Sequence, residues 1–463
     1  MLEKLFRIKE NGTSIRREIV AGFTTFTTLS YIIFVQPALL SIAGMEPGAV
    51  MVATCLSSAG ATILMAFMTN YPVALAPGMG INAYFVFSLC NPEALNLPWP
   101  DALGIVFISG MLFVILSFVG LREAVMNALP SALHNAIAVG IGLFIAFIGL
   151  QMSGIITIHG STYVTLGNIH SVPVLVSIFG IFVILTLLVL RVRGAILMGI
   201  LATTVLALLF GIVKFSGSVF TPPFDGVVSS PPSIAPTFFK LSFPNIFSKV
   251  ELIPIIFVFF SVDMFDSIGT LTATGHEADL LEDGKLTKGR QALLTDAIGS
   301  VGGACLGTST VTCYIESASG IAEGGRTGLT SIVVGLLMLL ALFFSPIIEI
   351  VGGSVPLITK TAINGVQTDV TTLLHPIIGP ALIAVGCLML KDLVNINWDD
   401  FTEAIPAALT VFMMPLSFSI TEGIAFGFIS ISFLKLVTGR HKELNPLVHY
   451  FAVFFVARYI GFA

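Results

Sequence analysis

Two aspartates three residues apart, Asp263 and Asp266, lie in the middle of an apolar stretch between Glu251 and His276. Residues three apart share one face of a helix, so both carboxylates are expected on the same side. A carboxylate at the centre of a bilayer costs about 2.5–3.5 kcal/mol even on a lenient insertion scale. No basic residue in this stretch offsets that cost, so the two acids require a polar cavity. Glu316 adds a third acid from a later apolar segment.

Buried, clustered carboxylates have raised pKa values, because low-dielectric surroundings and mutual repulsion both disfavour the charged form. Such groups exchange protons near neutral pH, which proton coupling requires. As acceptors they also suit a ligand with ring N–H groups. Tyr84, Phe85 and Tyr314 would supply flat apolar contact for a planar ring. The alternative stays open that an acid is structural and bonded to Thr or Ser, above all for Asp296 in the ninth segment.

The composition indicates an integral membrane protein. Of 463 residues, 56% are hydrophobic and 10% are charged, and the mean hydropathy is +1.00. A soluble domain carries about 25% charged residues. Apolar runs of about 20 residues, such as 174–190, are long enough to span a bilayer. The stretch 19–35 lacks the cleavage site of a signal peptide, so we expect it to be the first spanning helix.

Hydropathy and helix breakers divide the chain into about fourteen membrane segments. We expect a cytoplasmic tail at 1–18, seven segments in 19–213, an external loop at 214–249 and seven segments in 250–437. The C-terminal tail, 438–463, contains an apolar helix that either packs on the bundle or lies in the interface. With the N-terminus in the cytoplasm, most of the 21 Lys and Arg residues fall on the cytoplasmic side, as the positive-inside rule requires. The expected location is the plasma (cytoplasmic) membrane.

An odd number of segments gives the two halves opposite orientations. This is the arrangement of inverted-repeat transporters, whose sites form at discontinuous helices. In the first half, Pro77, Gly78 and Gly80 interrupt the third segment, 71–85. The segment also contains Pro72. An unbroken helix cannot hold two prolines without losing backbone hydrogen bonds, so we expect extended backbone followed by a half-helix.

The third segment of the second half, 302–316, repeats this pattern. The pair Gly302-Gly303, Gly307 and a run of Thr and Ser favour extended backbone, and Ser309 or Thr310 is expected to cap a half-helix. Exposed backbone is tolerated at membrane depth only where protein or a water-lined cavity satisfies it. The two segments are therefore expected to frame a binding site; the alternative is that Gly and Pro merely permit close packing.

These same stretches carry a family resemblance. The chain resembles the AzgA-like hypoxanthine/guanine/adenine permeases, a branch of the nucleobase–cation symporters in the nucleobase–ascorbate transporter superfamily. The matching stretches span nearly the whole chain and are 12–18, 71–85 (with Ala-Pro-Gly-Met-Gly-Ile-Asn-Ala), 149–156, Asp263 to Leu271, Gly307 to Gly320, and 414–417.

The resemblance implies an all-α membrane protein of the uracil-permease type, with seven plus seven inverted segments. Segments one to four and eight to eleven would form a core, and the others a gate. Asn82, Asp263 and Glu316 would contact a purine base. We assign Asp266 the proton role as a hypothesis, with Asp296 as a second coupling group. The partners would be protons, the lipid bilayer and hypoxanthine or guanine, with adenine as a further candidate, and carriers of this fold often form homodimers.

Several rival functions share parts of this pattern. A sodium-coupled nucleobase carrier stays open, because carboxylates and hydroxyls also bind Na⁺. An anion carrier of the same fold would use half-helix N-termini and often a basic residue, and three acids would repel its substrate. A passive channel would fit acid rings that favour cations. An enzyme would need a nucleophile with its base or a metal-ligand cluster, and the sequence offers neither. We expect no metal, cofactor or nucleic-acid partner, and the five scattered cysteines form no CxxC pair.

Overall fold

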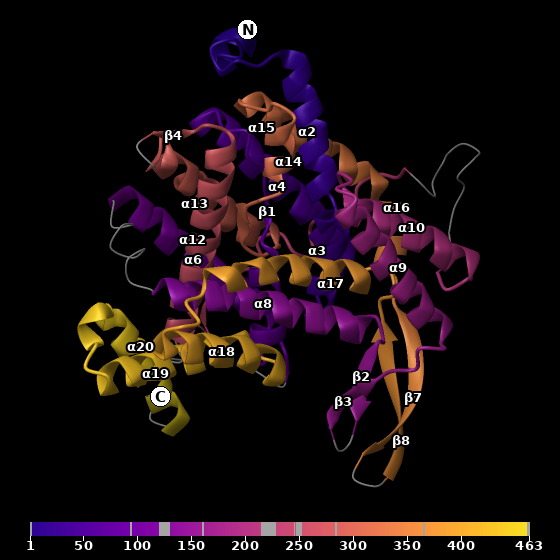
Figure 1. The fold of residues 1–463 in the computed structure, drawn as a ribbon. Helices are drawn as coiled ribbons and strands as arrows, with labels where there is room; N and C mark the ends of the chain where they lie inside the picture. The colour runs from indigo at the N-terminus through magenta and orange to yellow at the C-terminus, as the bar shows by residue number, and fades with distance from the viewer. Residues whose placement is uncertain are drawn as a thin grey trace.

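The computed structural model describes residues 2–92, 95–119, 130–159, 162–213, 228–244, 246, 252–282, 285–363 and 366–460. This part of the chain is mostly helical (Figure 1). Within it, eight helices are long and apolar enough to cross a membrane: 15–42, 47–69, 99–118, 131–152, 172–189, 255–277, 328–352 and 420–437. Shorter apolar helices cover 79–89, 195–209, 401–416 and 446–460. The prediction of a helical, multi-pass membrane protein is confirmed.

The described helices are distributed over both halves of the chain. The first half contains α1 (Leu2–Phe6), α2 (Ile15–Leu29), α3 (Ile32–Ile42), α4 (Pro47–Thr69), α5 (Met79–Tyr84), the π-helix η1 (Phe85–Leu89), α6 (Trp99–Val119), α8 (Ser131–Met152), α9 (Val172–Val189) and α10 (Ala195–Leu209). The second half contains α12 (Leu252–Glu277), α13 (Gly289–Leu306), α14 (Ser317–Ala322), α15 (Gly328–Ala341), η2 (Leu342–Phe344), α16 (Ser345–Gly352), α17 (Gly379–Met389), η3 (Leu390–Asn395), α18 (Phe401–Leu416), α19 (Ile420–Val437), η4 (His441–Glu443) and α20 (Pro446–Ile460).

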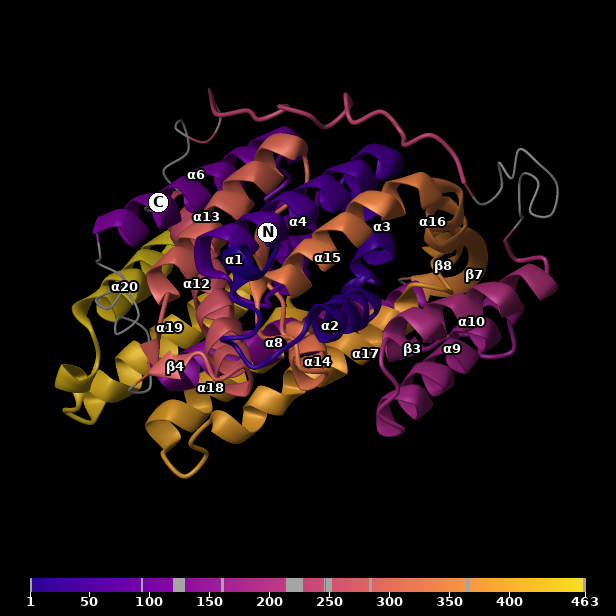
Figure 2. The same cartoon turned by 90° about the horizontal axis from the view of Figure 1, so that it is seen from above.

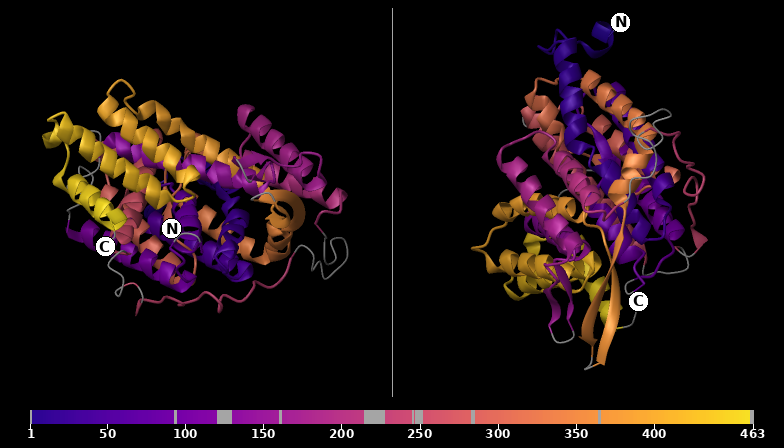
Figure 3. Two further views of the ribbon diagram at one scale, coloured as in Figure 1. Left: turned by 90° about the horizontal axis from the view of Figure 1, so that it is seen from below. Right: turned by 90° about the vertical axis from the view of Figure 1, so that its right-hand side faces the viewer.

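Two groups of helices pack against each other, and each draws on both halves of the chain. In the core group, α4 lies against α13 and α15, α6 against α12 and α13, and α2 against α14 and α15. In the gate group, α8 lies against α17 and α18, α9 against α10 and α17, and α18 against α19. Figure 1 shows α13 running up the view while α8, α17 and α18 run across it, and Figure 3 shows both groups from two other sides. The names core group and gate group follow the two parts that the resemblance implies.

The first segment differs from its predicted bounds of 19–35. Ser14 caps α2, which therefore begins earlier, and a break at Ser30 and Tyr31 separates α2 from α3, which continues to Ile42. Hydropathy missed the first turn because it is polar. Its Glu18 is buried and accepts hydrogen bonds from the backbone N–H and the hydroxyl of Thr330, in the first turn of α15. The end of the predicted tail is thus part of the bundle.

The all-α prediction is too narrow, because four two-stranded antiparallel sheets are present in the described residues. Two are hairpins beside the gate group, and Figure 3 (right) shows the longer one projecting beyond the helices. They pair β2 (Ile156–His159) with β3 (Tyr163–Leu166), and β7 (Val355–Ile363) with β8 (Val366–Leu374). A small hairpin pairs β4 (Leu281–Glu282) with β5 (Lys285–Leu286). The fourth sheet joins β1 (Leu75–Pro77) to β6 (Val311–Cys313) inside the core group.

The predicted external loop, 214–249, is described only for residues 228–244 and 246. This part runs as an extended strap along one side of the core group (Figure 2). Backbone hydrogen bonds fix it at both ends: Ser229 N–H donates to Phe343 O at 2.9 Å, and Ser242 N–H donates to Pro100 O at 3.0 Å. The strap therefore connects the end of α15 with the start of α6.

The C-terminal helix α20 packs on the bundle. It lies against α19, where Phe451 and Phe455 contact Phe428. Phe451 also stacks on Phe257 of α12, with the ring centroids 4.5 Å apart. Helix α20 thus touches one helix of each group.

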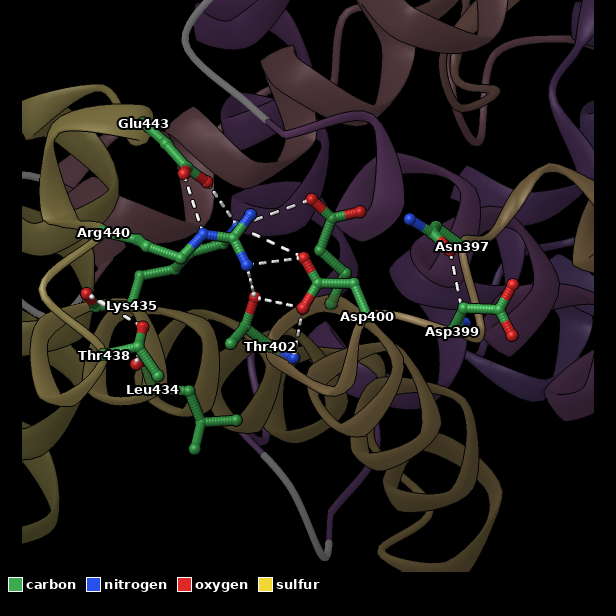
Figure 4. A network of polar contacts seen from close by, with 10 residues as sticks. Asn397, Asp399, Asp400, Thr402, Leu434, Lys435, Thr438, Arg440 and Glu443 are labelled. Atoms are coloured by element: carbon green, nitrogen blue, oxygen red, sulfur yellow. Dashed lines mark hydrogen bonds and ion pairs between the residues drawn. The ribbon is translucent and has the colours of Figure 1, made fainter.

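An ion-pair network fastens the end of the gate group where α19 leads into α20 (Figure 4). Arg440 donates to Asp400 and to Glu443, each at 2.7 Å. Lys435 is almost fully buried and its Nζ lies 2.7 Å from Glu443, 3.6 Å from Glu403 and 3.9 Å from Asp400. Because the buried cation is surrounded by carboxylates, its desolvation is offset by its partners.

Candidate functional site

The two broken segments meet as a pair of antiparallel strands. Strand β1 precedes the half-helix α5, and β6 precedes the half-helix α14. Leu75 lies opposite Cys313, and Pro77 lies opposite Val311. Beyond the strands, Gly78 N–H donates to the carbonyl of Thr310 at 3.0 Å. Each extended stretch therefore satisfies the backbone groups of the other, which confirms the prediction that each half contains a short extended stretch.

Glycines permit close contacts around the two broken segments, and Gly78 permits the approach of the strands themselves. A Cβ on Gly78 would lie 2.7 Å from Cγ2 of Thr312, so no larger residue fits between the strands without a shift. Gly307 ends α13 with φ +93°, in the left-handed region that favours glycine, and a Cβ there would lie 2.2 Å from Cβ of Thr237. Gly80 lies in the first turn of α5 and faces Ile141 of α8.

Two predictions about the second broken segment are wrong. Gly302 and Gly303 are not extended but belong to α13, where a Cβ on Gly303 would lie 2.6 Å from Ser309 O. Gly303 therefore lets the chain fold back against its own helix. Ser309 and Thr310 cap no helix, because α14 begins only at Ser317 and follows Glu316.

A buried chain of polar side chains crosses between the broken segments. Ser309 Oγ donates to Asn82 Oδ1, and Asn82 Nδ2 donates to Gln36 Oε1. Gln36 in turn donates to Thr308 Oγ1 at 3.0 Å. The Asn82 amide thus has protein partners at both ends in this conformation. Gln36 was not among the predicted site residues. A glutamine beside Pro37 within an apolar stretch is nevertheless a signal of the same kind as an acid inside a membrane segment.

Asp263 and Asp296 lie behind the strand pair as two fully buried carboxyls. The hydroxyl of Ser300 lies 3.1 Å from Asp263 Oδ2 and 3.0 Å from Val311 O, so its single proton is shared. Asp296 Oδ1 accepts the backbone N–H of Cys313 at 2.9 Å. The second oxygen of each carboxyl has no hydrogen-bond partner among the described residues. Two buried carboxyls on the neighbouring helices α12 and α13 repel each other when both are ionised.

Asp266 and Glu316 occupy a second, more open region. The hydroxyl of Tyr31 donates to Glu316 Oε1 at 2.9 Å, a contact that the sequence did not suggest. The side chain of Asp266, by contrast with Asp263, is exposed on the surface of α12. Asp263 and Asp266 were expected to lie on the same side of their helix. Instead, Asp263 faces Ser300 of α13, whereas Asp266 is exposed.

One face of α12 continues from Asp266 toward the end of the helix. Its exposed positions beyond Asp266 carry small or polar residues, namely Gly269, Thr272, Ala273, His276 and Glu277. Lipid-facing positions would be large and apolar, whereas acids inside a membrane face a bundle interior or a water-filled cavity. This polar face of α12 therefore lacks the large apolar residues of a lipid-facing surface.

The aromatic side chains predicted to hold a planar ring are packed against protein. Tyr84 stacks on Phe259, with ring centroids 4.8 Å apart, and its oxygen accepts a 2.9 Å hydrogen bond from Thr421. Tyr314 donates to Pro77 O at 2.6 Å. Phe85 is fully buried in the apolar core. The structure thus places all three aromatic side chains at the broken segments. Among the described residues, none of the three presents an open ring face to a planar ligand in this conformation.

Comparison with known proteins identifies the class of this chain. A family described as "Permease family" (Xan_ur_permease) matches residues 16–426, so the chain belongs to this family and is a transporter, not an enzyme. The transmembrane domain of BicA, a cyanobacterial bicarbonate transporter, has a similar fold, with a TM-score of 0.59, 12% identity and coverage of 89% of this chain and 96% of that domain.

Three relatives are similar over almost the full length of both chains. Putative permease MJ0326 of Methanocaldococcus jannaschii is 47% identical over 99% of this chain and 98% of its own. The guanine/hypoxanthine permease PbuG of Bacillus subtilis is 43% identical, with 99% of each chain covered. The adenine permease AdeP of Escherichia coli is 41% identical over 99% of this chain and 96% of its own.

Proposed function

We propose that this chain carries purine nucleobases into the cell together with protons. It is similar over nearly its whole length to PbuG, named a guanine/hypoxanthine permease, and to AdeP, named an adenine permease. The observation that carries the proposal is the set of four intramembrane acids around the strand pair: Asp263, Asp266, Asp296 and Glu316. Carboxyl oxygens suit the ring N–H donors of a purine, and acids that gain and lose protons supply the coupling.

Different acids suit different roles in this proposal. Asp263 and Glu316 receive the base, with Asn82 holding the two broken segments in register. Oδ1 of Asp263, which has no hydrogen-bond partner in the described part of the chain, is a buried acceptor that a ring N–H would satisfy. Asp266 exchanges the proton, because it is the exposed acid and the polar face of α12 leads away from it. Asp296 lies beside Asp263 and takes part in the same titration.

The topology belongs to the proposal as well. We place residues 1–18 in the cytoplasm, seven segments in each of 19–213 and 250–437, and the strap on the outer side. Short helices such as α5 and α14 then count as segments because each completes a crossing together with its strand. Alternating access would move the core group against the gate group while the strand pair keeps the site intact.

An anion carrier is the second function that a fold of this type supports, since BicA is a bicarbonate transporter. Such a site needs positive charge at the half-helices. Here the half-helices meet carboxylates, and the side chains described around the strand pair include no Lys or Arg. The uptake experiment described next distinguishes sodium coupling from proton coupling.

Uptake of radiolabelled hypoxanthine, guanine and adenine into transporter-deficient cells tests the proposal. The cells would express the wild type, Glu316→Gln or the control Glu349→Gln, which removes an exposed acid remote from the strand pair. Each would be assayed with and without a protonophore, and with Na⁺ replaced by K⁺. We expect saturable purine uptake that a protonophore or Glu316→Gln abolishes and that Na⁺ removal or Glu349→Gln leaves intact.

The opposite outcomes are equally informative. Uptake that survives the protonophore but requires Na⁺ would identify a sodium-coupled carrier. No purine uptake by protein shown to be in the membrane would refute the proposed function.

A further inference from the structure

A cavity of about 270 Å³ lies between the two groups of helices, beyond the half-helix α5. Its core wall is formed by Ser88, Asn91 and Leu95, which follow α5 in the chain. Its gate wall is formed by the turn between α18 and α19 and by the end of α20. Ligand pockets for drug-sized molecules span about 300–1,000 Å³, so this volume suits a smaller compound of the size of one heterocycle. On the proposed topology the cavity lies on the outer side.

A carboxylate and a guanidinium lie side by side in this cavity. Nη2 of Arg458 lies 2.9 Å from Oε1 of Glu422, and the Tyr459 hydroxyl donates to Oε2. Both charged side chains are only partly exposed, at 22% for Glu422 and 28% for Arg458. A guanidinium has five N–H donors and a carboxylate has about four acceptor positions. Each group therefore retains hydrogen-bonding capacity beyond their mutual contact.

The cavity is connected to the candidate site through the first turn of α19. Thr421 lines the cavity, and its hydroxyl donates to Tyr84 of α5 at 2.9 Å. Ser88 also lines it and accepts the backbone N–H of Ile420 at 3.2 Å. Phe418 adds an aromatic side chain to the wall and is held by Phe87 and Phe144. A molecule in the cavity would thus contact the helix end that bonds to Tyr84.

From this geometry we propose that the cavity is an outer binding site for 6-oxopurines, in which Glu422 and Arg458 recognise the edge of the base. The inference rests on the proposed function and extends it to substrate choice. Hypoxanthine and guanine present an N1–H donor beside the O6 and N7 acceptors. The carboxylate would accept from N1–H, and the guanidinium would donate to O6 and N7, the pairing that Arg makes with guanine in nucleic acids.

Adenine presents the opposite pattern to the same two groups. Its N1 is an acceptor that would face the Glu422 carboxylate, and its 6-amino group is a donor that would face Arg458. A site built to hydrogen-bond one edge rejects an edge that leaves its polar groups unpaired. The pair of Glu422 and Arg458 should therefore bind guanine and hypoxanthine more tightly than adenine.

The test measures hypoxanthine uptake kinetics and its inhibition by unlabelled guanine and adenine. The variants are Glu422→Gln, Arg458→Gln and Arg458→Lys, with Glu349→Gln and Lys240→Gln as exposed charge-removal controls outside the cavity. Loss of a charge-assisted pair should raise KM for hypoxanthine and the inhibition constant of guanine about tenfold, and that of adenine by less than about threefold. Arg458→Lys keeps the charge but loses the planar fork, so it should lose the same selectivity even if Arg458→Gln folds poorly.

The controls should leave all three constants unchanged. Normal hypoxanthine uptake with unaltered selectivity in Arg458→Lys and Glu422→Gln would overturn the outer site and leave the proposed function standing. A wild type that transports no purine would overturn both.

Discussion

Tyr31 and Glu316 come from opposite halves of the chain, and their side chains are joined by a 2.9 Å hydrogen bond from the tyrosine hydroxyl to Oε1. Tyr31 lies at the break between α2 and α3, and Glu316 lies at the end of the second broken segment. The hydroxyl is buried and fixes one oxygen of the carboxyl. The second oxygen of the Glu316 carboxyl is not bound by Tyr31 and is left for other contacts. The break in the first segment therefore places an orienting group at the proposed site.

Replacing Tyr31 with Phe removes this hydrogen bond and little volume. A buried acceptor that loses its donor costs about 1–3 kcal/mol, which corresponds to a rise of roughly 5- to 150-fold in KM for the purine. Uptake kinetics with a matched Tyr450→Phe control, on the exposed face of α20, would measure it. If Tyr31 served only folding, Tyr31→Phe would reduce the amount of protein in the membrane but leave KM at its wild-type value.

Replacing Asp266 with Asn keeps the shape of the side chain and removes its proton exchange. Because Asp266 is the exposed acid of the site, we expect purine exchange to continue while accumulation against a gradient and its dependence on external pH are lost. Uptake in proteoliposomes with an imposed pH gradient measures both. Glu349→Gln, an exposed acid outside the polar face of α12, is the control. Retention of the wild-type pH profile in Asp266→Asn would exclude the proton role.

Replacing Gly78 with Ala should separate the strands, because the new Cβ would lie 2.7 Å from Thr312 Cγ2. Overpacking of this kind costs about 1–3 kcal/mol. Thermal unfolding of the purified protein should show a lower midpoint, and the second change Thr312→Ser, which removes the clashing methyl group, should restore part of it. Gly60→Ala in α4 meets no atom within 4 Å and serves as the control. A midpoint for Gly78→Ala equal to that of Gly60→Ala would contradict the tight pairing.

The ion-pair network of Figure 4 predicts a dependence of stability on acid. Hydrogen bonds from Arg440 and Lys435 lower the pKa of Glu443 from its ordinary 4.5 to about 2, and hydrogen bonds from Thr402 and Arg440 lower that of Asp400. The folded state therefore favours the ionised Glu443. Its contribution to stability is fully present above about pH 4.5 and is lost as the pH falls toward 2.

Glu443→Gln tests this contribution. The variant should unfold at a lower temperature than the wild type at neutral pH, and the difference should shrink between pH 4.5 and 2. Glu349→Gln should show no such convergence. A difference between Glu443→Gln and the wild type that is constant over this range would assign the effect to packing instead of charge.

The membrane class, the two extended stretches and the grouping of acids were predictable because each follows from local residue types. Apolar length fixes a spanning segment, Pro and Gly disrupt a helix, and acids at membrane depth require partners. The hairpin of β7 and β8 could also have been predicted from the sequence. Its Thr- and Val-rich runs flank Asn364-Gly365, a dipeptide typical of tight hairpin turns.

The errors arose where contacts distant in sequence decide the outcome. Gly302 and Gly303 have a weak preference for extended backbone, but α13 packs against α4 and α6 and keeps them helical. Asp263 and Asp266 share a helix face in the sequence pattern, yet Ser300 of α13 binds one while the other is exposed. The Tyr31 and Gln36 contacts depend on tertiary packing, so no spacing rule revealed them.

The pairing of β1 with β6 has a consequence for how the protein is made. More than 230 residues of chain separate Leu75 from Cys313, and the ribosome delivers β1 long before β6. Until β6 arrives, the unpaired edge of β1 lies at membrane depth without a partner, where each unsatisfied backbone group is costly. The nascent first half is therefore an incomplete unit that membrane quality control would recognise. A chain cut between residues 213 and 252 should accumulate as stable protein only when both pieces are synthesised in the same cell.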